Sequence, residues 1–193
     1  MENVRVMLAI HNGEAAAKIK HALVLEGYTV TETCASGSET VRRVRESPPD
    51  ILLINFKLPD TTGLQVAQIV GDENLCSVIL MVSGSKRGYC EAVTREYDIT
   101  LLIKPVSRIA MLNTMDIVCQ NRKRMVRLAH EIEDLKDSLR SRKAVEKAKG
   151  ILMKKKCISE AEAYRRIQTM SMDSRVAMKD IAKKIIEYAQ KKE

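Results

Sequence analysis

The sequence of 193 residues lacks the patterns that mark several large classes of protein. Its five cysteines form no C-x-x-C pair and no Cys/His cluster, which argues against a disulfide framework and against a zinc site. No apolar run approaches the ~20 residues that span a bilayer. The chain also does not open with a basic region followed by a long apolar one. We therefore expect a cytoplasmic protein with no membrane segment, no metal and no other cofactor.

Groupings of residues that perform catalysis are missing too. No nucleophile, general base and orienting group occur together, so the sequence predicts no enzymatic activity and we assign no catalytic residue. No repeat of fixed period and no low-complexity segment is visible. The remaining function classes are those of a binding or regulatory protein.

Charge is distributed very unevenly along the chain. Residues 1–119 contain 12 Lys and Arg against 14 Asp and Glu, whereas residues 120–193 contain 21 against 11, a net charge of −2 against +10. The lysine-rich segment Val145–Lys156 also has apolar residues at helical spacing, so it should form a helix with one buried face. Such an asymmetry is typical of a chain in which one domain meets a nucleic acid or an acidic membrane.

Strand-like and helix-like segments alternate in the N-terminal part. The expected strands are Val4–Ile10, Tyr28–Glu32, Asp50–Phe56, Val78–Val82 and Thr100–Ile103. The expected helices are Glu14–Glu26, Gly37–Glu46, Gly63–Val70, Cys90–Glu96 and one that begins near Ser107. This order predicts a doubly wound α/β fold of the (βα)₅ type, with its functional site at the carboxyl ends of the strands.

Three segments resemble the receiver domains of response regulators. They are residues 50–63 (Asp-Ile-Leu-Leu-Ile-Asn-Phe-Lys-Leu-Pro-Asp-Thr-Thr-Gly), 78–84 (Val-Ile-Leu-Met-Val-Ser-Gly) and 102–105 (Leu-Ile-Lys-Pro). In the receiver domains that these segments resemble, an aspartate at the end of the third strand accepts a phosphoryl group. In those domains an acidic pair after the first strand holds Mg²⁺, and a Ser or Thr and a Lys sense the phosphate.

The sequence departs from the receiver pattern where that chemistry takes place. The phosphoacceptor position is Asn55, whose amide is not a nucleophile comparable to a carboxylate. The acidic pair is replaced by His11 and Asn12, or by Ile10 and His11 if the alignment is shifted by one residue, and neither pair supplies two anionic oxygens for Mg²⁺. Ser83 and Lys104 match the sensing positions. We therefore predict a pseudo-receiver that is not phosphorylated.

Two of these positions allow alternatives. Ser83 and Lys104 could persist for reasons of folding alone, with Lys104 capping strand-end carbonyls or pairing with Asp60. His11 could titrate near neutrality and act as a switch, or it could be an ordinary polar loop residue.

A long helix without proline or glycine is expected from Met111 to Arg142. Heptad spacing places Val118 at an a position and Asn121 at the first d position. The predicted dimerisation residues are Val118, Met125, Leu128, Ile132, Leu135 and Leu139. A seam this narrow needs a partner helix, so we predict a parallel homodimeric coiled coil. The alternative is that the stripe folds back on the receiver or on the C-terminal helices.

The C-terminal part predicts a small all-α bundle of three helices: the end of the connector through Met153, then Glu160–Met170 and Met178–Ala189. Ser159 and Glu162 form a capping box. Gly150 interrupts a good helix, and we expect it to permit close helix packing.

Residues 148–153 (Ala-Lys-Gly-Ile-Leu-Met), 159–164 (Ser-Glu-Ala-Glu-Ala-Tyr) and 180–186 (Asp-Ile-Ala-Lys-Lys-Ile-Ile) closely resemble the ANTAR domain, the RNA-binding output module of transcription antitermination regulators. The resemblance implies binding of paired RNA stem-loops in a leader transcript, which keeps a terminator hairpin from forming. The order pseudo-receiver, coiled coil and ANTAR domain resembles antiterminators of the amidase-operon type, which a protein partner controls.

Aromatic and basic side chains of this bundle are candidates for contact with RNA. Tyr164 could stack on an unpaired base, or it could be a tyrosine at the edge of the core. The predicted RNA-binding residues are Lys147, Lys149, Tyr164, Arg165, Arg166 and Lys179.

The sequence as a whole predicts three parts: a receiver-like domain over residues 1–117, a coiled-coil linker over 118–140 and an ANTAR domain over 141–190. The predicted function is that of a homodimeric, RNA-binding transcription antiterminator, with a regulatory protein as a further partner and no membrane contact. Two alternatives remain, a DNA-binding response regulator and a protein-interaction adaptor. The first is disfavoured because no helix-turn-helix segment with a short glycine-containing turn is visible.

Overall fold

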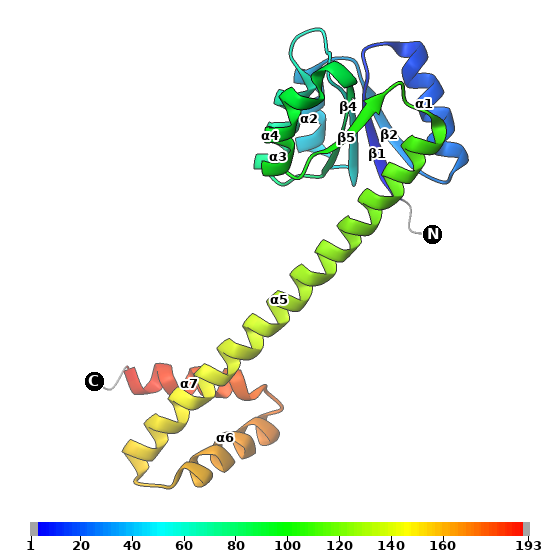
Figure 1. Cartoon of the computed structure of the whole chain (residues 1–193). Helices are drawn as coiled ribbons and strands as arrows, with labels where there is room; N and C mark the ends of the chain where they lie inside the picture. The colour runs from blue at the N-terminus through cyan, green and yellow to red at the C-terminus, as the bar shows by residue number, and fades with distance from the viewer. Residues whose placement is uncertain (1–3, 191–193) are drawn as a thin grey trace. The chain divides into compact units, whose positions relative to one another are not determined.

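The structure, a computed structural model, describes residues 4–190 (Figure 1). The chain divides into two compact units, residues 1–124 and residues 125–193. The helix α5 (Arg108–Lys156) contributes its first part to the first unit and the rest to the second.

The first unit contains a parallel sheet of five strands in the order β2-β1-β3-β4-β5. The strands are β1 (Arg5–Ala9), β2 (Thr29–Cys34), β3 (Ile51–Asn55), β4 (Ser77–Ser83) and β5 (Thr100–Lys104). The helices before α5 are α1 (Gly13–Leu25), α2 (Gly37–Glu46), α3 (Gly63–Asp72) and α4 (Arg87–Glu96), with the short 3-10 turn η1 (Gly84–Lys86) before α4. This arrangement confirms the predicted doubly wound fold.

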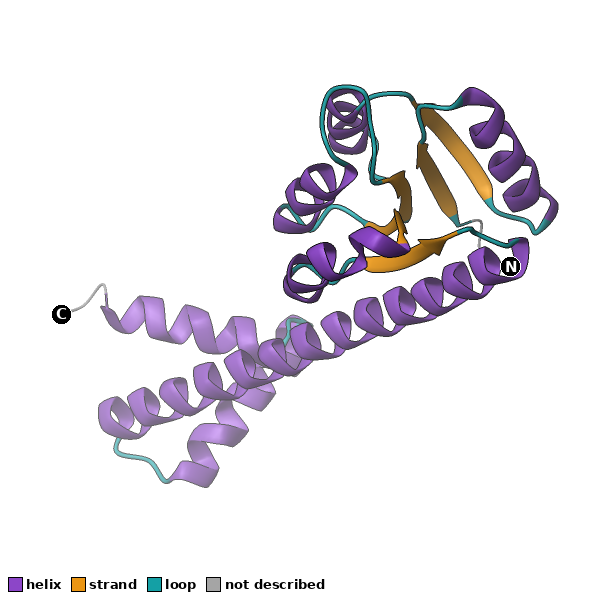
Figure 2. Ribbon diagram, turned by 45° about the horizontal axis from the view of Figure 1, so that its top comes forward, coloured by secondary structure: helices purple, strands orange, loops and turns teal. Residues whose placement is uncertain are grey.

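Helices cover both faces of the sheet, as Figure 2 shows. On one face, Leu52 and Leu80 pack with side chains of α2, α3 and α4. On the other face, Leu53 and Met81 pack with side chains of α1 and the start of α5. Continuous burial of β3 from Ile51 to Ile54 explains why that strand is apolar at every position and not at alternate ones.

The loops after the strands are fixed by caps and by one close approach. Asn12 and Ser36 cap α1 and α2, and Thr62 with Gln65 forms a capping box at the start of α3. A Cβ atom at Gly63 would collide with the backbone carbonyl of Asn55, so glycine is required where α3 begins. These features fix the backbone next to the end of β3.

The second unit contains the C-terminal part of α5, then α6 (Glu160–Ser174) and α7 (Met178–Gln190). Its core is small and consists of Ala148, Ile167, Ile181 and Ala182, with partly buried apolar residues around them. The capping box of Ser159 and Glu162 at the start of α6 is present, as the sequence predicted. The three predicted helices are therefore confirmed, with α5 and α6 each extending a few residues further.

Two expectations about particular residues are wrong. Val118 is not available for a coiled-coil seam, because its side chain is buried in the core of the first unit beside Met111 and Met115. Gly150 does not permit a close helix contact, because a Cβ atom there would meet no heavy atom within 4 Å.

Candidate functional site

The strand-end site of the first unit brings together Asn55 and Lys104. Lys104 Nζ donates a hydrogen bond of 2.7 Å to Asn55 Oδ1, from the end of β5 to the end of β3. Burial lowers the pKa of the Lys104 ammonium. The position that a phosphoacceptor would occupy therefore holds a neutral amide bonded to the lysine.

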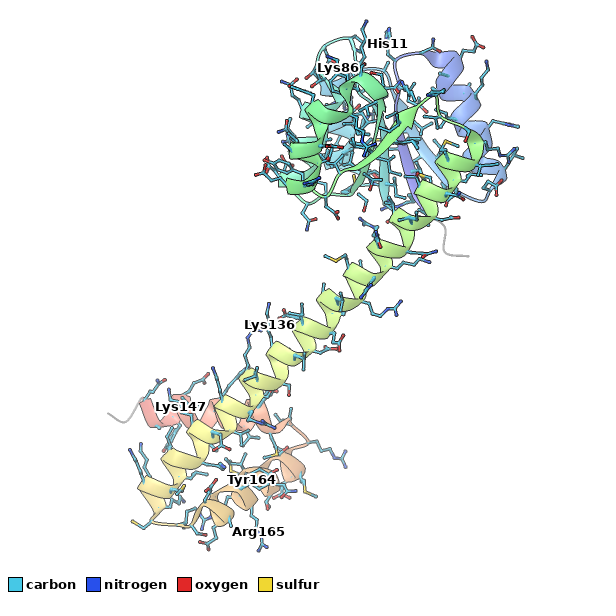
Figure 3. All side chains as sticks on the ribbon, viewed as in Figure 1. His11, Lys86, Lys136, Lys147, Tyr164 and Arg165 are labelled. Atoms are coloured by element: carbon cyan, nitrogen blue, oxygen red, sulfur yellow. The ribbon has the colours of Figure 1, made fainter. Side chains whose placement is uncertain are left out.

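The other residues predicted for this site do not take part in the hydrogen bond between Lys104 and Asn55. Ser83 Oγ lies 3.0 Å from Ser85 Oγ. Asn12 Oδ1 accepts a hydrogen bond from the backbone N–H of Ala15, so its side chain serves as a helix cap. His11 is exposed at the same end of the unit as Lys86 (Figure 3).

Asp60 has a different role from the one considered for it. Its carboxylate accepts hydrogen bonds from the backbone N–H groups of Gly37 (2.7 Å) and Ser38 (2.9 Å) at the start of α2. These bonds lower the pKa of Asp60 from its ordinary value to about 2. Asp60 thus ties the loop after β3 to α2. The alternative in which Lys104 pairs with Asp60 is not realised, because Lys104 donates to Asn55.

Nothing at this site fits the magnesium that receivers use. Between residues 4 and 190 there is no group of three His, Cys, Asp or Glu side chains placed to hold a metal ion. The amide oxygen of Asn55 already accepts a hydrogen bond from Lys104.

In the second unit, α6 presents an aromatic ring and two cations on its surface. Ala163 and Ile167 point into the core, so helix geometry turns Arg165, two residues from each of them, to the opposite side. Tyr164 is 45% exposed, and Arg165 and Arg166 are exposed as well. Figure 3 shows Arg165 on the outer side of α6. Neither arginine forms an ion pair with any residue between 4 and 190.

Lys149 is buried, whereas a residue that contacts RNA should be exposed. It is only 7% exposed, and its Nζ lies 2.7 Å from Glu146 Oε1 and 2.6 Å from Glu160 Oε1. Hydrogen bonds to Glu146 and then Glu160 raise the pKa of Lys149, and Lys149 in turn lowers the pKa of Glu160. This geometry joins α5 to the first residue of α6 and weighs against a direct role in RNA binding.

The remaining candidates come from two other helices. Lys147 is exposed on α5, and Lys179 is half-buried near the start of α7. The predicted RNA-binding residues thus fall on three helices of one small bundle, and Tyr164, Arg165 and Arg166 are consecutive on one of them.

An apolar stripe is exposed along α5. Within the second unit its residues are between 43% and 64% exposed: Met125, Leu128, Ile132, Leu135 and Leu139. In the first unit the exposed apolar neighbour of the buried Val118 is Ile117, at 58%. The sequence pattern missed Ile117 because Val118, and not Ile117, fits the heptad register. In the structure the side chain of Val118 packs in the receiver core.

Of the helices described here, none has the length and apolar character that crossing a bilayer requires.

Comparison with protein families assigns both units. Residues 8–116 match the response regulator receiver domain, and residues 133–186 match the ANTAR domain. The chain therefore belongs to the response-regulator receiver family, and it joins a receiver domain to an ANTAR domain. The two matches support an RNA-binding regulator of transcription antitermination.

One relative matches along nearly the whole chain. The transcriptional regulatory protein PdtaR of Mycobacterium tuberculosis is 26% identical over 183 residues, which is 95% of this chain and 89% of that protein. The nitrate regulatory protein of Klebsiella oxytoca is 32% identical over 72 residues, 37% of this chain and 18% of that protein. The match to the first of these covers most of both proteins, which are therefore similar in length.

Solved structures support the fold of the first unit. A response regulator receiver domain protein from Clostridium thermocellum superposes with a TM-score of 0.58 at 19% identity, covering 64% of this chain and 98% of that one. The signal receiver domain of an HD domain-containing protein from Pseudomonas fluorescens gives 0.59 at 13% identity, covering 66% and 94%. At these identities the likeness concerns the fold alone.

Proposed function

We propose that the chain is a homodimeric antiterminator that binds stem-loops of a leader transcript and prevents a terminator hairpin from forming. The observation that carries the proposal is the outer face of α6, where Tyr164, Arg165 and Arg166 are exposed within a region that matches the ANTAR domain. A hairpin loop offers unstacked bases to an aromatic ring and phosphates to cations.

The RNA-contacting residues in this proposal are Lys147, Tyr164, Arg165, Arg166 and Lys179. Lys149 is left out of the contact set because two carboxylates already hold its ammonium. Its ion pairs with Glu146 and Glu160 instead stabilise the junction of α5 and α6. The net charge of +10 on residues 120–193 adds attraction that does not depend on RNA sequence.

Dimerisation rests on the stripe of α5. Five large apolar side chains at coiled-coil spacing are exposed in the single chain, and a second copy of the same helix is the partner that buries such a seam. Leu128, Ile132, Leu135 and Leu139 form its core, with Met125 at its edge. Two copies would bring two ANTAR domains to a paired stem-loop target.

Control by phosphorylation is not part of the proposal. Asn55 cannot form an acyl phosphate, and its hydrogen bond to Lys104 occupies the lysine that would sense one. We propose that a regulatory protein acts on the receiver-like domain, as in antiterminators of the amidase-operon type. Proposed boundaries are residues 1–117 for that domain, 118–140 for the linker and 141–190 for the ANTAR domain, with the first linker residue, Val118, still packed in the receiver core. The proposed location is the cytoplasm.

An RNA selection tests the function directly. Two-hairpin RNAs with randomised loops are selected on the full chain, and the enriched RNA is compared with its single hairpins and with a DNA duplex of the same sequence. The expected result is enrichment of two-hairpin RNA, with affinity that falls steeply as salt rises. Preference for the duplex would support a DNA-binding regulator, and no enrichment at all would overturn the proposal.

A further inference from the structure

Gly150 lies inside α5, where nothing within the protein requires glycine. Its φ is not in the left-handed region, and a Cβ atom would meet no heavy atom within 4 Å. Glycine inside a helix is less favourable than alanine, because the unfolded chain has more freedom to lose. In the described part of the chain, the other glycines with open space and an ordinary φ are Gly13, the first residue of α1, Gly84, the first residue of η1, and Gly88, the second residue of α4.

The surface around Gly150 is positively charged. One turn away along α5 lie Lys147 on one side and Lys154 on the other, and Lys143 lies two turns back on the same face. All three lysines are exposed, and none is ion-paired within residues 4–190. Glu146, also one turn away, shares the ammonium of Lys149 with Glu160, at 2.7 and 2.6 Å.

We propose that Gly150 is a point of close approach for the sugar-phosphate backbone of RNA, with Lys147 and Lys154 contacting phosphates on either side of it. This inference rests on the proposed function and adds a residue to its surface. A missing side chain lets a ligand come nearer to the helix than any other residue allows. The three exposed ammonium groups around the gap, of Lys143, Lys147 and Lys154, select a polyanion as that ligand.

The test replaces Gly150 with alanine and with leucine in the full chain. The selected two-hairpin RNA is the probe, and Ser138→Ala, an exposed change on the same helix that also raises helix propensity, though by less, is the control. Gly150→Ala is expected to keep or raise the melting temperature and to weaken RNA binding about fivefold to tenfold, and Gly150→Leu to weaken it further. Ser138→Ala is expected to leave affinity unchanged.

Lys147→Ala and Lys154→Ala complete the test. Each is expected to lower the salt dependence of binding by roughly one phosphate contact. If the wild-type chain binds RNA and Gly150→Ala binds it equally well, the close approach is overturned while the proposed function stands. If the wild type binds no RNA, the proposed function itself fails.

Two further outcomes would also overturn the role of Gly150. A lower melting temperature for Gly150→Ala would mean that the space beside this residue is filled in the folded protein. Loss of the dimer in light scattering, together with weaker binding, would mean that the gap accommodates a second copy of the chain and not RNA.

Discussion

Lys104 and Asn55 hold the ends of β5 and β3 together through a hydrogen bond of 2.7 Å. The acceptor is a neutral amide oxygen, so the contact exists without any modification of the chain. Lys104, which stands at the position that senses the phosphate in receivers, therefore already has a hydrogen-bond partner at the strand-end site.

The first prediction concerns phosphorylation. Incubation of the wild-type chain with acetyl phosphate and Mg²⁺ is expected to add no phosphoryl group, measured by intact mass, because an amide is not the required nucleophile. Asn55→Asp alone is also expected to remain unmodified, since His11 and Asn12 cannot hold Mg²⁺. The triple variant with aspartate at positions 11, 12 and 55 serves as the positive control. A wild-type mass increase of one phosphoryl group would contradict the prediction.

The second prediction concerns pH and Asp60. Its folded pKa of about 2 lies below its ordinary value of 3.8. The stabilisation it provides is therefore complete above pH 3.8 and lost as the pH falls towards 2. Asp60→Asn should lower the free energy of unfolding at pH 7, and the difference from wild type should shrink between pH 4 and pH 2. Asp134→Asn, at an exposed position on α5, should show no such trend.

Much of the fold follows from local patterns. The helix Gly37–Glu46 was predicted from its helix-like sequence with the bounds that the structure shows, and in the structure Ser36 caps its start. The apolar run around Ile51–Asn55 identified a strand buried on both faces. The helix depends on interactions between residues close together in the sequence, and the strand is recognised because every one of its positions from Ile51 to Ile54 is apolar.

The errors arise where tertiary contacts compete with a local pattern. Val118 satisfies a heptad, but α5 turns that side chain into the receiver core and leaves Ile117 outside. Lys149 satisfies a basic pattern, but Glu160 comes within 2.6 Å of it once α6 folds back. No spacing along one segment reveals which of several lysines will meet a carboxylate from the next helix.

The third prediction separates Lys149 from Lys147. Lys149→Met removes the cation held by Glu146 and Glu160, so the melting temperature of the second unit should fall by a few degrees, while RNA affinity measured well below that temperature stays within about twofold. Lys147→Met, at an exposed position, should show the opposite pattern of unchanged stability and weaker binding.

A double-variant comparison checks that the loss of stability comes from the ion pair. Glu160→Gln should lower the melting temperature much as Lys149→Met does, and combining the two should add little. Strictly additive effects would show that Lys149 stabilises the bundle in some other way.

The fourth prediction separates the dimer seam from the receiver core. Leu135→Asp places a charge in the proposed seam and should convert the dimer to a monomer in light scattering, with little effect on the melting of the first unit. Val118→Ala removes buried apolar atoms and should destabilise the first unit by ~1–3 kcal/mol without changing the oligomeric state. A chain that is already monomeric before substitution would rule out the seam.

The fifth prediction concerns the outer face of α6. Tyr164→Ala should cost about 1–3 kcal/mol of RNA binding through lost base stacking, whereas Tyr164→Phe, which keeps the ring, should bind nearly as well as wild type. Arg165→Ala should weaken binding and reduce the slope of affinity against salt by ~0.7, the contribution of one phosphate on a single strand.

Lys136→Ala provides the control for this surface. Lys136 is an exposed cation of α5 outside the proposed contact set, paired at 3.8 Å with Glu133, so its removal should change neither the slope nor the affinity. If Tyr164→Phe binds as weakly as Tyr164→Ala, the hydroxyl and not the ring makes the contact, and stacking is the wrong description. Equal losses for Lys136→Ala and Arg165→Ala would mean that RNA responds to total charge, and α6 would then have no special place in recognition.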